Sequence, residues 1–151
     1  ICSNLFANHI YYWGDQHYGQ TMGPDRAMRM DACATAKRID VPFTIHSDAP
    51  VTPLDPLFTA WCAVNRQTAS GRILGPNERI DVEDSLKAIT LGAAFTLHLD
   101  HLVGSIEPGK YADFAVLDDD PTTVLAQALK DVPVWGTVID GIARPASQNR
   151  N

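Results

Sequence analysis

The sequence has few cysteines, no surplus of basic residues and no long apolar run. Cys2, Cys33 and Cys62 lack the Cys-x-x-Cys spacing of zinc and redox motifs, so a reduced, cytoplasmic setting is expected, with an exported protein carrying free thiols as the alternative. The net charge of −6 and the absence of a basic run argue against nucleic-acid binding through phosphate neutralisation. No apolar stretch approaches the roughly 20 residues of a membrane helix. The sequence therefore predicts neither a nucleic-acid nor a membrane partner, but a small molecule.

What the sequence does contain is the balance of a globular protein. Its 151 residues are 45% hydrophobic and 20% charged, which provides a core for one domain, or for one domain and a small second one. The chain enters an apolar segment directly at Ile1, with neither an initiator Met nor a basic leader before it. The sequence is therefore expected to be part of a longer protein.

The first third of the sequence predicts a strand, a loop, a helix and a second strand. Residues 1–7 are apolar, and a polar and aromatic loop follows as far as Tyr18. From Asp25 onward, apolar residues recur at helical spacing with basic residues between them, and residues 41–46 return to strand character. Because a strand–helix–strand crossover is right-handed, the two strands are expected to be parallel.

Two longer helices are predicted after the second strand. They cover residues 56–66 and 81–97, and each begins just after an aspartate suited to cap it, Asp55 and Asp81 respectively. The apolar residues of the second of these helices lie on one face, which predicts a purely structural role.

The last third of the sequence changes character after Asp100. Turns at Pro108-Gly109 and at Asp140-Gly141 predict two hairpins of short strands, and residues 121–129 predict a short helix between them. The change from long helices to short antiparallel strands indicates two structural units.

Five side chains that can bind a metal or move a proton follow the two predicted parallel strands: His9, Asp15, His17, His46 and Asp48. Parallel strands end at the same edge of a sheet, so these groups can converge on one site. Imidazole and carboxylate are the ligands of zinc in hydrolytic sites, and a carboxylate beside a zinc-bound water is a good proton acceptor. Taken singly, each of the five is more often a surface or capping residue, so the prediction depends on their convergence.

Asp48 is the most informative of these residues. An apolar run stops at His46, and the carboxylate of Asp48 follows at the start of a proline-containing loop, where parallel α/β folds bind their ligands. The alternative is an ordinary turn, because Ser-Asp-x-Pro is typical turn sequence. Trp13 also has two interpretations, since its ring can form an apolar wall for a substrate or can simply pack the loop.

Five motifs together resemble the carboxyl-terminal part of the metal-dependent amidohydrolases, and most closely the amidohydrolase-3 or YtcJ-like subgroup, which includes N-substituted formamide deformylases. The motifs are Asn8-His9-Ile-Tyr-Tyr-Trp-Gly-Asp15-Gln-His17, Gly23-Pro-Asp-Arg26-Ala, Thr44-Ile-His-Ser-Asp48-Ala-Pro-Val, Gly104-Ser-Ile-Glu-Pro-Gly-Lys-Tyr-Ala-Asp-Phe-Ala-Val-Leu-Asp118 and Thr137-Val-Ile-Asp-Gly. The resemblance implies an α/β fold in which residues 1–101 supply strands 7 and 8 of a TIM-like (β/α)8 barrel. Residues 102–146 would form part of a small composite β-sandwich, and residues 147–151 are expected to be a disordered tail.

The resemblance also implies roles for the site residues. Asp48 would end the eighth strand, where the family's aspartate ligates or faces the metal and takes the proton from the metal-bound water. His9 would be a substrate-side group, and Trp13, Asp15 and His17 are expected beside it in a pocket for a small amide-like molecule. The expected metal is divalent, most simply Zn²⁺.

Other ligands of the family have no counterpart in the sequence: the His-x-His of the first strand, the bridging residue of the fourth and the histidines of the fifth and sixth. Since a catalytic zinc takes three protein ligands, this chain is expected to be inactive alone and to need the missing amino-terminal part of the barrel as its partner. The function expected of the whole protein is hydrolysis of a non-peptide carbon–nitrogen bond. The alternatives are a non-catalytic truncated module, half of a split enzyme, or a deaminase or lactone-cleaving member of the superfamily.

Overall fold

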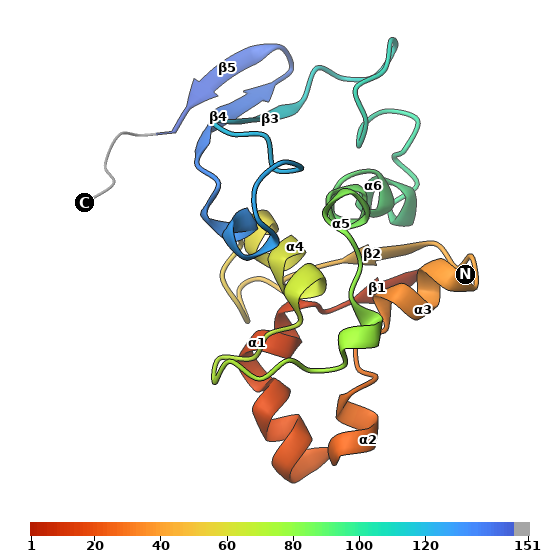
Figure 1. Ribbon diagram of the computed structural model, residues 1–151. Helices are drawn as coiled ribbons and strands as arrows, with labels where there is room; N and C mark the ends of the chain where they lie inside the picture. The colour runs from red at the N-terminus through yellow and green to blue at the C-terminus, as the bar shows by residue number, and fades with distance from the viewer. Residues whose placement is uncertain (147–151) are drawn as a thin grey trace.

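The computed structural model describes residues 1–146, so the tail predicted at residues 147–151 lies outside the described residues. Within that range the fold is mixed α/β, with two separate sheets (Figure 1). A parallel sheet pairs β1 (Ser3–Leu5) with β2 (Phe43–Ile45). An antiparallel sheet has the order β3-β4-β5, built from β3 (Phe114–Leu117), β4 (Val134–Ile139) and β5 (Ile142–Pro145).

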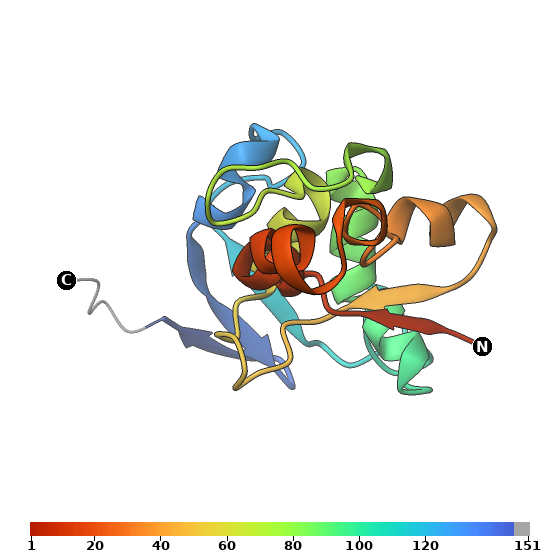
Figure 2. The ribbon, with the colours of Figure 1, turned by 90° about the horizontal axis from the view of Figure 1, so that it is seen from below.

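The parallel pairing of the first two strands confirms the prediction from sequence. Ser3 lies opposite Phe43 and Leu5 lies opposite Ile45, and the two strands run side by side toward the same edge (Figure 2). The carboxyl ends of both strands therefore lie at the same edge of the sheet, as the predicted site requires.

The loop predicted between the first strand and Tyr18 is wrong. Helix α1 (Asn8–Gln16) starts directly after β1 and continues into a π-helical turn, η1 (His17–Thr21). The sequence carries no start signal, because Ala7 occupies the N-cap position and makes no side-chain hydrogen bond. Tertiary packing forms the helix instead: Ile10 is buried in a small apolar cluster with Ala27 and Leu74.

The single helix predicted from Asp25 is two short ones, α2 (Pro24–Ala27) and α3 (Cys33–Arg38). The interruption has a tertiary cause. The Arg66 guanidinium donates hydrogen bonds to the backbone carbonyls of Met30 and Asp31, which in a continuous helix would accept from backbone N–H groups of that helix. Asp31 itself adopts a left-handed backbone conformation, with φ of 47°.

The two longer helices start where the sequence predicts. Helix α4 (Pro56–Asn65) is capped by the Asp55 carboxylate, and α5 (Val82–Ile89) by that of Asp81. The second helix, however, breaks at Thr90 and resumes as α6 (Leu91–Thr96), in which Gly92 lies so close to β2 that a Cβ would be 2.6 Å from the Phe43 carbonyl oxygen. Helices α4, α5 and α6 all pack against β2, and a 3-10 turn, η2 (Pro76–Glu78), precedes α5.

The hairpin predicted at Pro108-Gly109 does not form. Residues 99–113 are a series of turns in which the Tyr111 N–H donates to the Leu102 carbonyl, and β3 pairs with β4 rather than with a strand before the turn. The hairpin at Asp140-Gly141 is confirmed, with positive φ at both residues. The short helix predicted at residues 121–129 is a 3-10 helix, η3 (Ala126–Asp131).

The main core surrounds α4, which lies between α1, α5 and η3. Its centre is the run Ala60, Trp61, Cys62 and Ala63, all of them buried. Leu129 from η3 packs into the same cluster, so the core links the two sheets. Among residues 1–146, no helix is long and apolar enough to cross a membrane.

Candidate active site

The carboxyl ends of β1 and β2 bring His9, His46 and Asp48 to one place. The two backbones are joined there by a hydrogen bond from the His46 N–H to the Leu5 carbonyl, at 3.0 Å. The Phe6 ring stacks on both imidazoles, with centroids 4.7 Å from His9 and 5.2 Å from His46. The convergence predicted at the strand ends is therefore present for His9 and His46, with Asp48 in the turn that follows. It does not include Asp15, whose carboxylate binds Ser70 and Arg72 instead.

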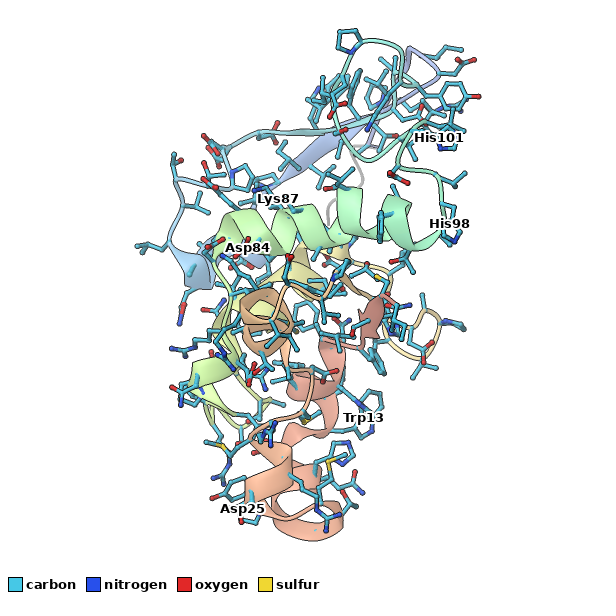
Figure 3. The ribbon with its side chains drawn as sticks, turned by 90° about the vertical axis from the view of Figure 1, so that its right-hand side faces the viewer. Trp13, Asp25, Asp84, Lys87, His98 and His101 are labelled. Carbon is cyan, nitrogen blue, oxygen red and sulfur yellow. The ribbon has the colours of Figure 1, made fainter. Side chains whose placement is uncertain are left out.

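Helix α1 adds two more predicted residues to this cluster. His9, Trp13 and His17 are spaced four residues apart, so they lie on one face of the helical segment. The His9 ring lies 5.1 Å from Trp13 and 4.9 Å from His17 between centroids, both in edge-on contact. Figure 3 shows Trp13 on α1, far from His98 and His101, which follow α6 and received no role from the sequence. The helix that the sequence missed is thus what aligns the predicted residues.

The surroundings of the His9 imidazole favour its neutral form. Burial lowers its pKa, and the neighbouring His17 and His46 lower it further, while the Asp48 carboxylate opposes them. A neutral imidazole both donates and accepts a hydrogen bond, so His9 can orient a polar group of a substrate.

Asp48 lies in the first turn after β2 and is exposed. Its φ is 54°, a left-handed conformation, and its carbonyl accepts a hydrogen bond of 2.7 Å from the Val51 N–H. An Asp tolerates this conformation better than most residues. The turn interpretation of Ser-Asp-x-Pro is therefore correct for the backbone, and it is compatible with a chemical role for the carboxylate.

Asp15 lies on a different side of α1 from His9. Its carboxylate accepts hydrogen bonds of 2.9 Å from the Ser70 hydroxyl and 3.3 Å from Arg72 Nε. These contacts tie α1 to the loop that precedes η2. The substrate-binding role assigned to Asp15 stays a prediction, as do those of His9, Trp13 and His17.

Sequence reasoning missed three residues that shape the site. In the sequence, Phe6 belongs to an apolar run, Asn8 begins a family motif without a role of its own, and Thr52 belongs to no motif. The Asn8 side chain donates to the Thr52 hydroxyl at 2.8 Å, and that hydroxyl donates to the Ser47 carbonyl, next to Asp48. The only available signal was two polar residues close to apolar strand ends, which does not distinguish them from surface residues.

Two hollows accompany β2. One of about 190 Å³ lies at its carboxyl end and is lined by Ile45, His46 and Ser47 together with residues of α4 and the loop before it. A larger open groove of about 430 Å³ lies at the opposite end of the strand, between α3, α5 and α6. Only the smaller hollow touches the residues of the candidate site.

The donor set does not complete a metal centre. Within residues 1–146, no group of three or more His, Cys, Asp or Glu side chains is placed to hold a metal ion. A catalytic zinc takes three protein ligands, so the side chains of this chain fit at most one part of such a site.

Comparison with known proteins gives a consistent set of relatives. A sequence model described as "Amidohydrolase family" matches residues 1–142. N-substituted formamide deformylase of Arthrobacter pascens is 34% identical over 101 residues, which are 67% of this chain and 19% of that protein. Putative amidohydrolase YtcJ of Bacillus subtilis is 34% identical over 98 residues, 63% of this chain and 18% of that protein. The chain thus spans about a fifth of the length of these relatives.

Solved structures resemble the fold as well. An uncharacterized metal-dependent hydrolase from Pyrococcus horikoshii matches with a TM-score of 0.66 at 23% identity, over 82% of this chain and 25% of that one. An adenosine deaminase from Xanthomonas campestris with bound zinc matches with a TM-score of 0.60 at 24% identity, over 78% of this chain and 28% of that one. At these identities the likeness concerns the fold alone.

Proposed function

Because the chain belongs to the amidohydrolase family, we propose that it is the carboxyl-terminal part of a hydrolase that cleaves a non-peptide carbon–nitrogen bond in a small amide-like molecule. The family match over residues 1–142 supports the reaction class. The relative described as an N-substituted formamide deformylase supports amides or formamides as the substrate class. The expected cytoplasmic setting is part of the same proposal.

The proposed position in the whole protein follows from two incomplete surfaces. In the described part of the chain, each strand of the β1–β2 sheet has one edge without a partner strand, which agrees with β1 and β2 being strands 7 and 8 of a (β/α)8 barrel. The antiparallel sheet exposes large apolar side chains, including Trp135, Ile139 and Ile142, which agrees with residues 102–146 forming part of a sandwich. The amino-terminal part of the protein would complete both.

The observation that carries the proposal is the Asp48 carboxylate in the turn after β2, at the edge where both parallel strands end and where His9 also lies. In such hydrolases a bound divalent metal, here expected to be Zn²⁺, lowers the pKa of a water toward neutrality. The remaining metal ligands would come from the part of the protein outside this chain. Asp48 would take the proton from the hydrolytic water, and His9 would orient the substrate amide against the wall formed by Trp13 and Phe6.

The test is the substitution Asp48→Asn in the complete enzyme. Asparagine tolerates the left-handed backbone at this position, so the turn is preserved while the proton acceptor is lost. We expect kcat for amide or formamide substrates to fall at least about 100-fold. The measurement is steady-state hydrolysis of a set of N-substituted formamides and amides.

Asp40 provides a matched control, because it is also an exposed aspartate with a φ of 54° and lies at the opposite end of β2. Asp40→Asn should leave kcat within about two-fold, as expected of a surface change away from the site. Turnover by Asp48→Asn within a few-fold of wild type would exclude the proposed role of Asp48.

A second candidate is that this chain is one half of a split enzyme, or a module without catalysis. The incomplete donor set in residues 1–146 favours it. Mixing the chain with a separately produced amino-terminal half that contains His-x-His, followed by measurement of bound zinc, distinguishes these cases. Zinc retained at one or two equivalents per complex supports the split enzyme, and no zinc above the level of the separate halves supports the module.

A further inference from the structure

A buried polar connection joins the two strand ends that carry His9 and Asp48. Asn8 is 0% exposed and Thr52 is 1% exposed, although both are polar. The Asn8 Nδ2 donates to Thr52 Oγ1 at 2.8 Å, and Thr52 Oγ1 donates in turn to the Ser47 carbonyl. The path therefore runs from the residue before His9 to the residue before Asp48.

The chemistry of the connection demands a hydroxyl at position 52. A threonine hydroxyl can accept one hydrogen bond and donate another at the same time, whereas a valine of the same shape can do neither. Buried polar groups without partners are costly, so the Asn8 amide and the Ser47 carbonyl hold the Thr52 side chain in one orientation. The Thr52 side chain consequently fixes the distance between the start of α1 and the turn after β2.

The turn at Asp48 has few other restraints on its direction. Asp48 and the residues that follow it up to Val51 are exposed, and the left-handed backbone of Asp48 is uncommon for a residue other than glycine. The hydrogen bond from the Val51 N–H to the Asp48 carbonyl closes the turn but does not connect it to the rest of the fold. Thr52 is the next buried residue, and its hydroxyl returns to Ser47 across the base of this turn.

We propose that Asn8 and Thr52 are positioning residues that hold the Asp48 carboxylate in register with His9 through the Ser47 carbonyl. This inference rests on the proposed function of Asp48. Neither residue touches the reacting atoms. They determine where the proton acceptor stands relative to the substrate-side imidazole.

The experiment uses the complete enzyme with Thr52→Val and Thr52→Ser. Displacement of a reacting group by about 1 Å costs up to about 100-fold in rate, so we expect Thr52→Val to lower kcat by about 10- to 100-fold. KM should stay within about three-fold, because the groups that bind substrate on α1 are retained. Thr52→Ser keeps the hydroxyl and should restore kcat to within about three-fold of wild type, which a requirement for packing volume alone would not produce.

Thr44→Val is the matched control for stability. Thr44 is buried at 4% exposure, and its hydroxyl donates at 2.8 Å to the Ala88 carbonyl, which ties β2 to α5 away from the Asp48 turn. Both valine variants should lower Tm to a similar extent, but Thr44→Val should leave kcat within about two-fold. Equal kcat values for the two valine variants would overturn the positioning role.

Two further measurements separate the inference from the function on which it rests. The double variant Asn8→Ala with Thr52→Val should lose little more kcat than the worse single variant, because the two side chains act as one unit; independent, additive losses would contradict the connection. Asp48→Asn is measured in parallel. If Asp48→Asn is inactive and Thr52→Val is fully active, only the positioning role fails, whereas an active Asp48→Asn overturns the proposed function itself.

Discussion

The two sheets of this chain differ in how completely they are covered. The β1–β2 sheet has four helices packed against β2, namely α3, α4, α5 and α6, and the residues around it include nearly all of the buried core. In the β3–β4–β5 sheet, Leu117 and Val134 pack against the main core. Trp135, Ile139 and Ile142 of the same sheet are exposed. The first region is therefore stabilised mainly by contacts within the chain, whereas the second leaves large apolar side chains exposed.

The exposed face of the second sheet follows from the pairing of its strands. Ile139 lies directly opposite Ile142, so the two side chains are on the same face. A soluble monomer rarely leaves such a group of large apolar side chains open. The contrast with the first region supports the proposal that a further layer of the complete protein covers this face.

The largest effect that tests this contrast is expected at Arg66. The side chain is 0% exposed and donates to three backbone carbonyls, those of Leu74, Met30 and Asp31, at 2.6 to 2.9 Å. Arg66→Met leaves these carbonyls without their donor and should destabilise the protein by about 3–5 kcal/mol in urea unfolding. Arg144→Met on exposed β5 should change stability by less than about 0.5 kcal/mol. Similar losses for both variants would break the contrast between the regions.

The second effect is a pH dependence that comes from Asp31. Burial raises the pKa of its carboxyl group to about 6, with the Arg66 guanidinium and the Phe6 N–H partly opposing the rise. The buried thiols of Cys33 and Cys62 also face this carboxyl group. Because the folded state holds the proton more tightly than the unfolded chain, whose pKa is near 3.8, folding is favoured by Asp31 at low pH and loses that contribution as the pH rises through 6.

We therefore expect wild type to lose about 2 kcal/mol relative to Asp31→Asn between pH 4 and pH 6.5. The measurement is urea unfolding of both proteins across that range. Asp120 in the second region contributes a pH dependence of stability with the opposite sign, because the hydroxyl and backbone N–H of Thr122 lower its pKa. Its contribution is lost only as the pH falls below about 4. A difference between wild type and Asp31→Asn that does not change with pH would refute the buried state of Asp31.

The smallest predicted effect tests directly whether another part of the protein covers the sheet face that carries Ile142. Ile142 and Ile39 have nearly the same exposure in this chain, 60% and 61%, and lie in the second and first region respectively. If another part of the protein covers the β-sheet face, Ile142→Thr should destabilise the complete enzyme by about 1–2 kcal/mol through lost apolar burial. Ile39→Thr should cost less than about 0.5 kcal/mol. Equal costs, measured by thermal unfolding, would show that the face is not covered.

Local signals predicted much of the fold because they depend on neighbours in the sequence. The caps at Asp55 and Asp81, the parallel pair and the Asp140-Gly141 hairpin all follow from capping and turn chemistry or from periodicity. Helix α1 could not be predicted in this way. It lacks a cap, and it forms because Ile10 packs against residues that are distant in the sequence.

In the candidate site too, some features follow from local sequence patterns and others only from tertiary contacts. The types and order of His9, His46 and Asp48 are visible in the sequence, because strand periodicity places them after β1 and β2. The alignment of His9 with Trp13 and His17 is not visible, since it requires the helix that the sequence failed to indicate. Asn8 and Thr52 were missed because a buried polar residue is recognisable only once its partner, 44 residues away, is known.

Residues a few positions apart in the sequence indicate the strands β1 and β2, the starts of the capped helices α4 and α5 and the chemical groups that follow the two strands. Only the tertiary structure decided which groups meet. The Arg66 guanidinium breaks a helix by taking the carbonyls of Met30 and Asp31, and the Thr52 hydroxyl joins two strand ends. Both effects require partners far apart in the chain, and the free energy of satisfying buried polar groups, which no local pattern encodes, selects them.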